Sequence, residues 1–154
     1  MYKFGVDTKR RPEPLISRSA HFVSFLIVLA LNGAAFGAEF LSVRDAHKAA
    51  VAKDLILVDV RRPDEWKQSG VPESAALNSM HQRGFLERLD ELTGGRKNAK
   101  IALICATGGR TTWLSTELEK RGYTNLYNVR EGMFGSDAGP GWLAAKLPTK
   151  VFRE

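Results

Sequence analysis

The sequence predicts an α/β domain built around a parallel sheet, because two apolar runs alternate with segments of helical pattern. The runs are residues 55–58 and 101–104. A continuous apolar run is typical of a strand that is covered on both faces, as the strands of parallel sheets are. The chain has 154 residues, of which 44% are apolar, and this suits a single domain with its own hydrophobic core.

The first half of the domain is expected to carry three elements besides the strand at 55–58. Ser42 can cap a helix that runs through residues 45–50, since its hydroxyl can accept a first-turn amide. Pro63 can open a short helix, because its fixed φ suits the first helical position. An extended piece at residues 75–77 follows.

The second half is expected to hold two helices, each with apolar side chains at helical spacing and glycine after its end. The apolar positions are Phe85, Leu86, Leu89 and Leu92 in the first helix, and Trp113, Leu114 and Leu118 in the second. Gly94-Gly95 end the first helix and Gly122 ends the second. The strand at 101–104 leads directly into Cys105, and a last short strand is expected at 126–129.

Residues 1–37 have the layout of a secretory signal peptide. A basic stretch precedes an apolar run at residues 22–31, which only Ser24 interrupts, and small residues follow. This run is shorter than the ~20 residues that a helix needs to cross a bilayer. Cleavage after Gly37 would place Ala35 and Gly37 at the two positions where signal peptidase requires small side chains. The sequence therefore predicts an exported, periplasmic protein; an uncleaved anchor, the only expected tie to a membrane, is the alternative.

The basic charge of the chain belongs largely to this first segment. The formal net charge is +6, but five Lys/Arg and only two Asp/Glu lie in residues 1–37, so the remainder carries +3. No dense basic patch remains that could neutralise phosphates. Nucleic acid is therefore excluded as a partner.

Cys105 is the only cysteine of the chain, so no disulfide can form within the chain. A cysteine at the end of an apolar strand is often a small core residue. Here a glycine loop, an expected helix and Arg110 follow it, which favours a reactive thiol at the carboxyl end of a parallel strand. Both interpretations stay open on these features alone.

The segment 105–110 has the chemistry of an anion-binding loop. Glycines at 108–109 allow a tight turn in which successive backbone amides point inward. A helix that begins near Thr111 adds the positive end of its dipole, and Arg110 adds a full charge. Such surroundings favour a thiolate over a thiol, and they would hold a persulfide anion on Cys105 in the same way.

Three motifs, in order along the chain, resemble those of the single-domain rhodaneses. They are Asp59-Val60-Arg61 with Asp64-Glu65-Trp66, the Cys-x-x-Gly-x-Arg loop at 105–110, and Asn128-Val129-Arg130-Glu131-Gly132 with Trp142 and Leu147-Pro148. The resemblance covers residues 40–148. It implies a rhodanese-like domain at residues 40–150, with a five-stranded parallel sheet and helices on both faces.

The resemblance also implies a function: a sulfurtransferase that moves sulfane sulfur from a donor such as thiosulfate to a thiophilic acceptor through a persulfide on Cys105. Cyanide, a small thiol or a protein thiol would be the acceptor, and neither a metal nor an organic cofactor is implied. The catalytic residues would be Cys105 and Arg110. The persulfide-binding loop would comprise Ala106, Thr107, Gly108 and Gly109, and structural support would come from Asp59, Arg61 and Glu65.

Two departures from the family's pattern concern the surroundings of this site. Residues 70–75 read Gly-Val-Pro-Glu-Ser-Ala and lack the family's histidine. Glu131 stands where the family often has a glycine, and residues 134–141 lengthen the following loop. We expect this loop to lie near the pocket.

Several residues have simpler structural interpretations. Asp59 is expected to hydrogen-bond nearby backbone, and Arg61 is expected to pair with Glu65 at the i,i+4 spacing of a helix. The three tryptophans are expected in the core or as pocket walls. They are Trp66, Trp113 and Trp142. His47 and His81 have neither metal-ligand spacing nor a sequence link to the cysteine.

Two alternative functions remain. Phosphatases and arsenate reductases of the same fold separate their cysteine and arginine by five residues, because a tetrahedral oxyanion needs a wide loop. Four residues separate Cys105 from Arg110, and the shorter loop favours a sulfur atom. The other alternative is a non-catalytic module that carries sulfur or binds a partner, against which the presence of both residues argues.

Overall fold

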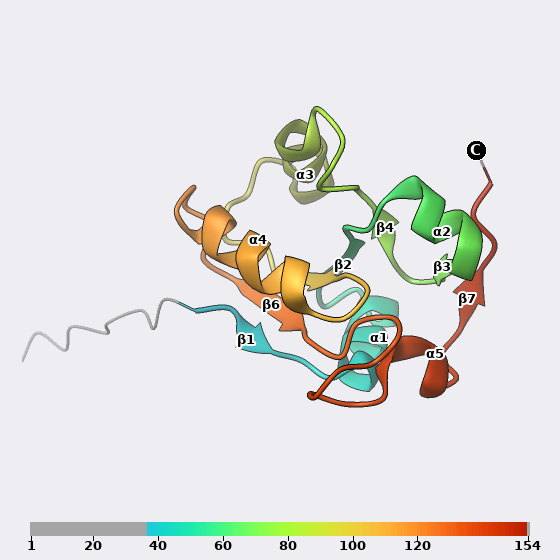
Figure 1. Cartoon of the computed structure of the whole chain (residues 1–154). Helices are drawn as coiled ribbons and strands as arrows, with labels where there is room; N and C mark the ends of the chain where they lie inside the picture. The colour runs from blue at the N-terminus through green and yellow to red at the C-terminus, as the bar shows by residue number, and fades with distance from the viewer. Residues whose placement is uncertain (1–36, 154) are drawn as a thin grey trace, which may run out of the picture. The chain divides into compact units, whose positions relative to one another are not determined.

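The computed structural model describes residues 37–153 of the chain, and Figure 1 shows their arrangement. The expected signal peptide lies outside these residues, except for Gly37. Within residues 37–153, no helix combines the length and the apolar character that a membrane span needs.

A five-stranded sheet forms the centre of the domain, and every neighbouring pair of its strands is parallel. The strand order is β1-β6-β5-β2-β4. The strands are β1 (Glu39–Phe40), β2 (Ile56–Asp59), β4 (Ala76–Leu77), β5 (Ile101–Ile104) and β6 (Leu126–Val129). The expected parallel sheet is therefore confirmed, and the two apolar runs of the sequence are its central pair, with Ile56 opposite Ile101.

Helices cover both faces of this sheet, as expected, because alternate side chains of β5 point to opposite sides. Ala102 and Ile104 pack with α1 (Val43–Val51) and α5 (Gly141–Ala144). Ile101 and Leu103 pack with α3 (Phe85–Thr93) and α4 (Gly109–Glu119) on the other face. Figure 1 shows α3 and α4 on one side of the strands and α1 with α5 on the other.

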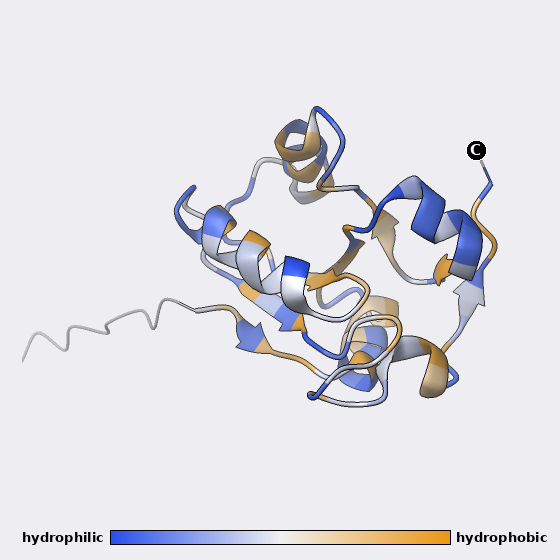
Figure 2. Cartoon of the chain, viewed as in Figure 1, coloured by the Kyte–Doolittle hydropathy of each residue, from blue (hydrophilic) through white to orange (hydrophobic). Residues whose placement is uncertain are grey.

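A second, two-stranded sheet was not expected from the sequence. β3 (Val71–Pro72) pairs antiparallel with β7 (Thr149–Lys150), so the C-terminal segment lies beside the end of α2 (Pro63–Ser69). In Figure 2, α2 is mostly hydrophilic, whereas β2 and β4 are apolar. Two-residue strands carry no period that a sequence pattern can reveal, which is why this pair was missed.

The expected helix ends are confirmed at three places. The Ser42 hydroxyl accepts the amide of Asp45 at 3.1 Å and caps α1. Pro63 is the first residue of α2, and Gly94 ends α3 with a left-handed backbone at φ +62°. The helix expected to begin near Thr111 begins two residues earlier, because the first residue of α4 is Gly109.

The three tryptophans do not share one environment. Trp66 and Trp142 are buried, as expected for core residues. Trp113 is 59% exposed and lies outside the core, but it lines a surface pocket with Phe85 and Leu114, so the expected position as a pocket wall is confirmed. It lies on the outer side of α4, while Leu114 and Leu118 supply the apolar face of that helix.

Candidate active site

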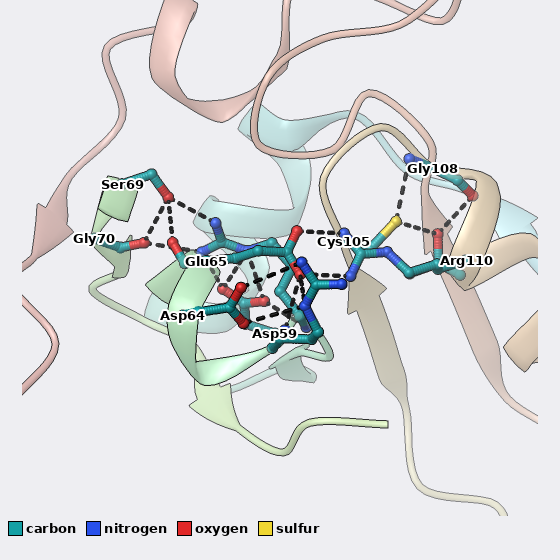
Figure 3. A network of polar contacts seen from close by, with 11 residues as sticks. Asp59, Asp64, Glu65, Ser69, Gly70, Cys105, Gly108 and Arg110 are labelled. Atoms are coloured by element: carbon teal, nitrogen blue, oxygen red, sulfur yellow. Dashed lines mark hydrogen bonds and ion pairs between the residues drawn. The ribbon is translucent and has the colours of Figure 1, made fainter. Parts of the chain in front are cut away.

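Cys105 lies directly after β5, where the chain turns into α4. Its side chain is buried, and it packs on the face of the sheet that α3 and α4 cover. The backbone amide of Gly108 donates a hydrogen bond to Sγ at 3.2 Å, and the Thr111 hydroxyl lies 3.7 Å from Sγ. Figure 3 shows the sulfur close to Gly108, on the side of the site away from Ser69 and Gly70.

The first turn of α4 supplies further donors to this place. The first four amides of a helix have no partner within the helix, and in α4 the first internal bond runs from Thr112 N to Gly108 O. The amides of Gly109 and Arg110 are therefore available to an anion near Cys105, and the positive end of the helix dipole adds to them.

A network of polar side chains connects the cysteine loop and the start of α4 to β6. The Thr111 hydroxyl lies 2.7 Å from Asn128 Oδ1 and 2.9 Å from Gly108 O, and Asn128 Nδ2 donates to Thr112 Oγ1 at 2.8 Å. Asn128 and Thr111 are buried. Sequence reasoning missed this network. Its signal was a polar residue inside the short apolar strand β6, together with two threonines in the first turn of α4.

The cysteine loop and the following loop fit together through their backbones. Met133 N donates to Cys105 O at 2.9 Å, and Phe134 N donates to Ala106 O at 3.0 Å. Gly108 has φ +85°, and a Cβ on it would clash with the carbonyl oxygen of Arg130. Gly132 has φ +66°, and a Cβ on it would clash with the carbonyl oxygen of Ala106. Phe134, the first residue of the 134–141 loop, thus lies beside the cysteine loop, which agrees with the expectation that this loop lies near the pocket.

Glu65 and Arg110 form a two-point ion pair next to the sulfur. Arg110 Nη1 donates to Oε2 at 2.7 Å, and Nη2 donates to Oε1 at 2.6 Å. The hydrogen bond from Arg110 lowers the pKa of Glu65 from 4.5 to about 2, although burial acts in the opposite direction. The same bond raises the pKa of Arg110, and Cys105 adds a smaller contribution in that direction. Figure 3 shows the Arg110 side chain directed toward Glu65.

This pair corrects one prediction. We expected Glu65 to pair with Arg61, but Arg61 precedes the N-cap residue of α2, Arg62. The i,i+4 geometry exists only within a helix, so Arg61 and Glu65 do not face each other. Glu65 is instead the third residue of α2, where its Oε2 accepts the amide of Arg62 at 3.0 Å and so satisfies a free donor at the start of the helix.

Arg61 pairs with Asp59, and both side chains are fully buried. Arg61 Nη2 lies 2.6 Å from Oδ2, and Nε donates to Oδ1 at 3.0 Å. Arg61 also donates to Ser69 Oγ and to Gly70 O, at the end of α2. Asp59 accepts the backbone amide of Arg61 at 3.1 Å, so its expected hydrogen bond to nearby backbone is confirmed. The pair therefore connects the end of β2 to the end of α2.

Glu131, which stands in a position that the family often gives to glycine, is a buried backbone acceptor. Its Oε1 accepts the amide of Val43 at 3.0 Å, and its Oε2 accepts the amide of Gly141 at 3.2 Å. The side chain thus joins the starts of α1 and α5.

Neither histidine of the described residues contacts the cysteine. His47 lies against Trp142 with ring centroids 5.4 Å apart, and its Nδ1 is 3.4 Å from Ser74 Oγ. Across residues 37–153, no group of three His, Cys, Asp or Glu side chains is arranged to hold a metal ion.

The sequence singled out nine residues for this site, and hydrogen bonds within the site involve five of them. These five are Ala106, Cys105, Gly108, Arg110 and Glu65. Gly108 contacts the sulfur of Cys105, Arg110 holds Glu65, and Ala106 joins the following loop. Asp59 and Arg61 lie beside them as a separate pair. The remaining two, Thr107 and Gly109, lie in the same loop. Such a place suits a sulfur anion: one amide donates to it, further amides are available, and a guanidinium is near.

Comparison with known sequences agrees with this geometry. Residues 42–137 match the family described as the rhodanese-like domain. An uncharacterized protein of Rickettsia prowazekii is 31% identical over 102 residues, which are 60% of this chain and 80% of that protein. The tRNA uridine(34) hydroxylase of Pelagibacter ubique is 31% identical over 81 residues, which are 53% of this chain but only 26% of the hydroxylase.

Two solved structures are similar to about three quarters of the chain. The polysulfide-sulfur transferase homodimer of Wolinella succinogenes is 29% identical with a TM-score of 0.53, covering 73% of this chain and 78% of that one. Rv0390 of M. tuberculosis has a TM-score of 0.60 over 75% of this chain and 99% of its own, and at 24% identity it shows the fold alone. By its sequence over residues 42–137, the chain belongs to the rhodanese-like domain family.

Proposed function

We propose that the protein is a sulfurtransferase that carries sulfane sulfur as a persulfide on Cys105. The observation that carries the proposal is the amide of Gly108, which donates to Sγ at the start of α4, with Arg110 beside it. These groups stabilise a sulfur anion at this position. The Wolinella protein is by its name a polysulfide-sulfur transferase, which supports sulfur as the transferred group.

In the first half-reaction, the Cys105 thiolate attacks the outer sulfur of a donor such as thiosulfate. A bond forms between Sγ and this sulfur, and the sulfur–sulfur bond of thiosulfate breaks. The bonding electron pair leaves with sulfite, and the negative charge of the thiolate moves to the outer sulfur of the persulfide. The amides of the loop and the guanidinium of Arg110 stabilise the charge that moves.

In the second half-reaction, a thiophilic acceptor attacks the outer sulfur of the persulfide. Cyanide, a small thiol or a protein thiol takes this sulfur, and the Cys105 thiolate returns. Neither a metal nor an organic cofactor takes part in either half. Arg110 acts through its charge and its fork of donors.

The experiment is intact mass spectrometry of the purified protein before and after thiosulfate. We expect a gain of about 32 Da on Cys105, which excess thiol or cyanide reverses. Cys105→Ser should fold but gain nothing, because a hydroxyl does not ionise near neutral pH or hold sulfane sulfur. A folded wild-type protein that gains no sulfur from any donor would overturn the proposal.

The same preparation separates the two other functions. A module that only carries sulfur would gain the sulfur atom but would not produce thiocyanate repeatedly from thiosulfate and cyanide. A phosphatase or arsenate reductase would turn over a phosphate ester or arsenate. The four-residue spacing between Cys105 and Arg110 argues against the latter pair.

We also propose that the protein is exported and that residues 1–37 are removed. The proposal rests on the basic, apolar and small-residue order of this segment. N-terminal sequencing of protein from the extracytoplasmic fraction should read from Ala38. A chain that still begins at Met1 would favour an uncleaved anchor instead.

A further inference from the structure

The charge beside the sulfur is balanced by a carboxylate of the protein itself. Both terminal nitrogens of Arg110 are held by Glu65, at 2.7 Å and 2.6 Å. A two-point pair of this kind occupies the edge of the guanidinium, formed by its two terminal nitrogens, that would otherwise bind two oxygens of an anionic donor. An anionic donor therefore meets an arginine whose best binding edge is already occupied.

Glu65 is held in this position from its own side as well. Its Oε2 accepts the amide of Arg62, and the Arg62 Nε lies 3.7 Å from the same oxygen. The Glu65 side chain is only 15% exposed. Because its pKa is about 2, the carboxylate keeps its charge across the whole neutral range. The negative charge is thus a permanent part of the site.

The neighbouring charges do not change this balance. Arg62 is paired with Asp64 at 3.1 Å as well as with Glu65. The connected group contains two arginines and two carboxylates, Arg62, Arg110, Asp64 and Glu65, and its net charge is zero. A donor with two negative charges leaves more hydration behind than a donor with one, and it meets no net positive charge here in return.

From these contacts we infer that Glu65 is a specificity-determining residue, which makes the site favour sulfur donors with one negative charge over donors with two. The inference rests on the proposed function, because it concerns the donor that loads Cys105. The favoured class comprises thiosulfonates and persulfide monoanions. Thiosulfate, a dianion, is then a usable but disfavoured donor.

Two donors that share one chemistry isolate the effect of charge. Thiosulfate gives its outer sulfur to the Cys105 thiolate and leaves as sulfite, which keeps both negative charges. Benzenethiosulfonate gives its outer sulfur by the same attack and leaves as benzenesulfinate, with one charge. In both cases one sulfur–sulfur bond breaks, one forms, and no oxidant or proton is needed. The donor kcat/KM reports this first half-reaction alone.

The experiment compares kcat/KM for these two donors, with cyanide as acceptor, in the wild type and in Glu65→Gln. The variant removes one charge, and the side-chain oxygen of glutamine can still accept the amide of Arg62. We expect the ratio of thiosulfate to benzenethiosulfonate kcat/KM to rise about tenfold. Glu117→Gln is the matched control, because it removes the same charge from α4 at a site paired with Lys120 and Arg121. Its ratio should equal that of the wild type.

A ratio that does not move in Glu65→Gln, while both donors still load Cys105, overturns the inference and leaves the proposed function intact. A wild type that neither donor loads overturns the proposed function itself. A ratio that moves equally in Glu117→Gln also overturns the inference, since net charge alone would then explain it.

A second variant covers the case in which Glu65→Gln does not fold. Arg62→Gln removes one of the two cations near Glu65 and leaves Arg110 in place. The Arg62 side chain is 53% exposed, so folding depends little on it. The ratio should then fall about threefold, because the carboxylate loses part of its screening. An unchanged or increased ratio in folded Arg62→Gln contradicts the inference.

Discussion

Asp59 and Arg61 form an ion pair from which solvent is excluded: both side chains are fully buried, and Arg61 Nη2 lies 2.6 Å from Asp59 Oδ2. The remaining donors of the guanidinium reach Ser69 and Gly70, so nearly every charge-bearing group has a partner. The pair lies at the end of β2 and holds the end of α2.

Arg61→Met should therefore destabilise the domain strongly. It leaves the Asp59 carboxylate buried without a counter-ion, a loss that typically amounts to about 3–5 kcal/mol. Urea unfolding at neutral pH measures the change. Arg121→Met is the control, since Arg121 is half exposed and its surface ion pair with Glu117 contributes little to stability. Equal effects of the two substitutions would contradict the structural role of Arg61.

Gly108→Ala should disrupt the cysteine loop beyond the ordinary strain of a left-handed residue. Gly122 has a similar φ of +87° but no atom within 4 Å of an added Cβ, so Gly122→Ala reports the strain alone. That strain is about 1–2 kcal/mol. Gly108→Ala should lose more stability than this and should also lose sulfur loading by mass spectrometry. Equal losses of stability in the two variants would mean that the loop moves aside without difficulty.

The ion pair of Glu65 should make stability depend on acid pH. The pKa of Glu65 is about 2 in the folded protein and 4.5 ordinarily, so the unfolded chain binds the proton more tightly. The contribution of Glu65 is thus complete above its ordinary value and is lost as the pH falls through the folded one. The stability difference between wild type and Glu65→Gln should shrink between pH 4.5 and about 2. Urea unfolding at several pH values tests this, and a difference that does not vary with pH would refute it.

Arg110→Ala should impair the use of anionic donors more than it impairs folding. The guanidinium is part-exposed, so its removal leaves no large cavity, whereas a lost charge-assisted contact raises the barrier by about 2–4 kcal/mol. Steady-state thiosulfate kinetics and a thermal melt on the same sample measure both effects. Unchanged kinetics in a folded Arg110→Ala protein would remove Arg110 from the mechanism.

The sequence predicted the sheet because the pattern of its central strands is strong. The run at 101–104 is fully buried and the run at 55–58 is buried or partly buried, so the residues of both are apolar without interruption. The short edge strand β1 and the β3–β7 pair have only two residues each and carry no such pattern. They form because the folded domain brings their backbones together, which local sequence does not reveal.

The site was predictable where its parts are close in sequence. The spacing of Cys105, Gly108 and Arg110 indicates one loop, and the structure places the Gly108 amide on the sulfur. The Arg110–Glu65 pair joins residues 45 positions apart, and only the parallel arrangement of β2 and β5 brings them together. The i,i+4 rule therefore selected the wrong partner for Glu65, because it takes no account of distant residues.

The close backbone approaches at Gly108 and Gly132 limit how this site can change in evolution. When a new side chain collides with another side chain, a second mutation to a smaller residue can relieve the collision. Here each Cβ would meet a carbonyl oxygen, of Arg130 in one case and of Ala106 in the other, and no substitution shortens a carbonyl group. Second-site suppressors of changes at these two glycines should therefore be rare.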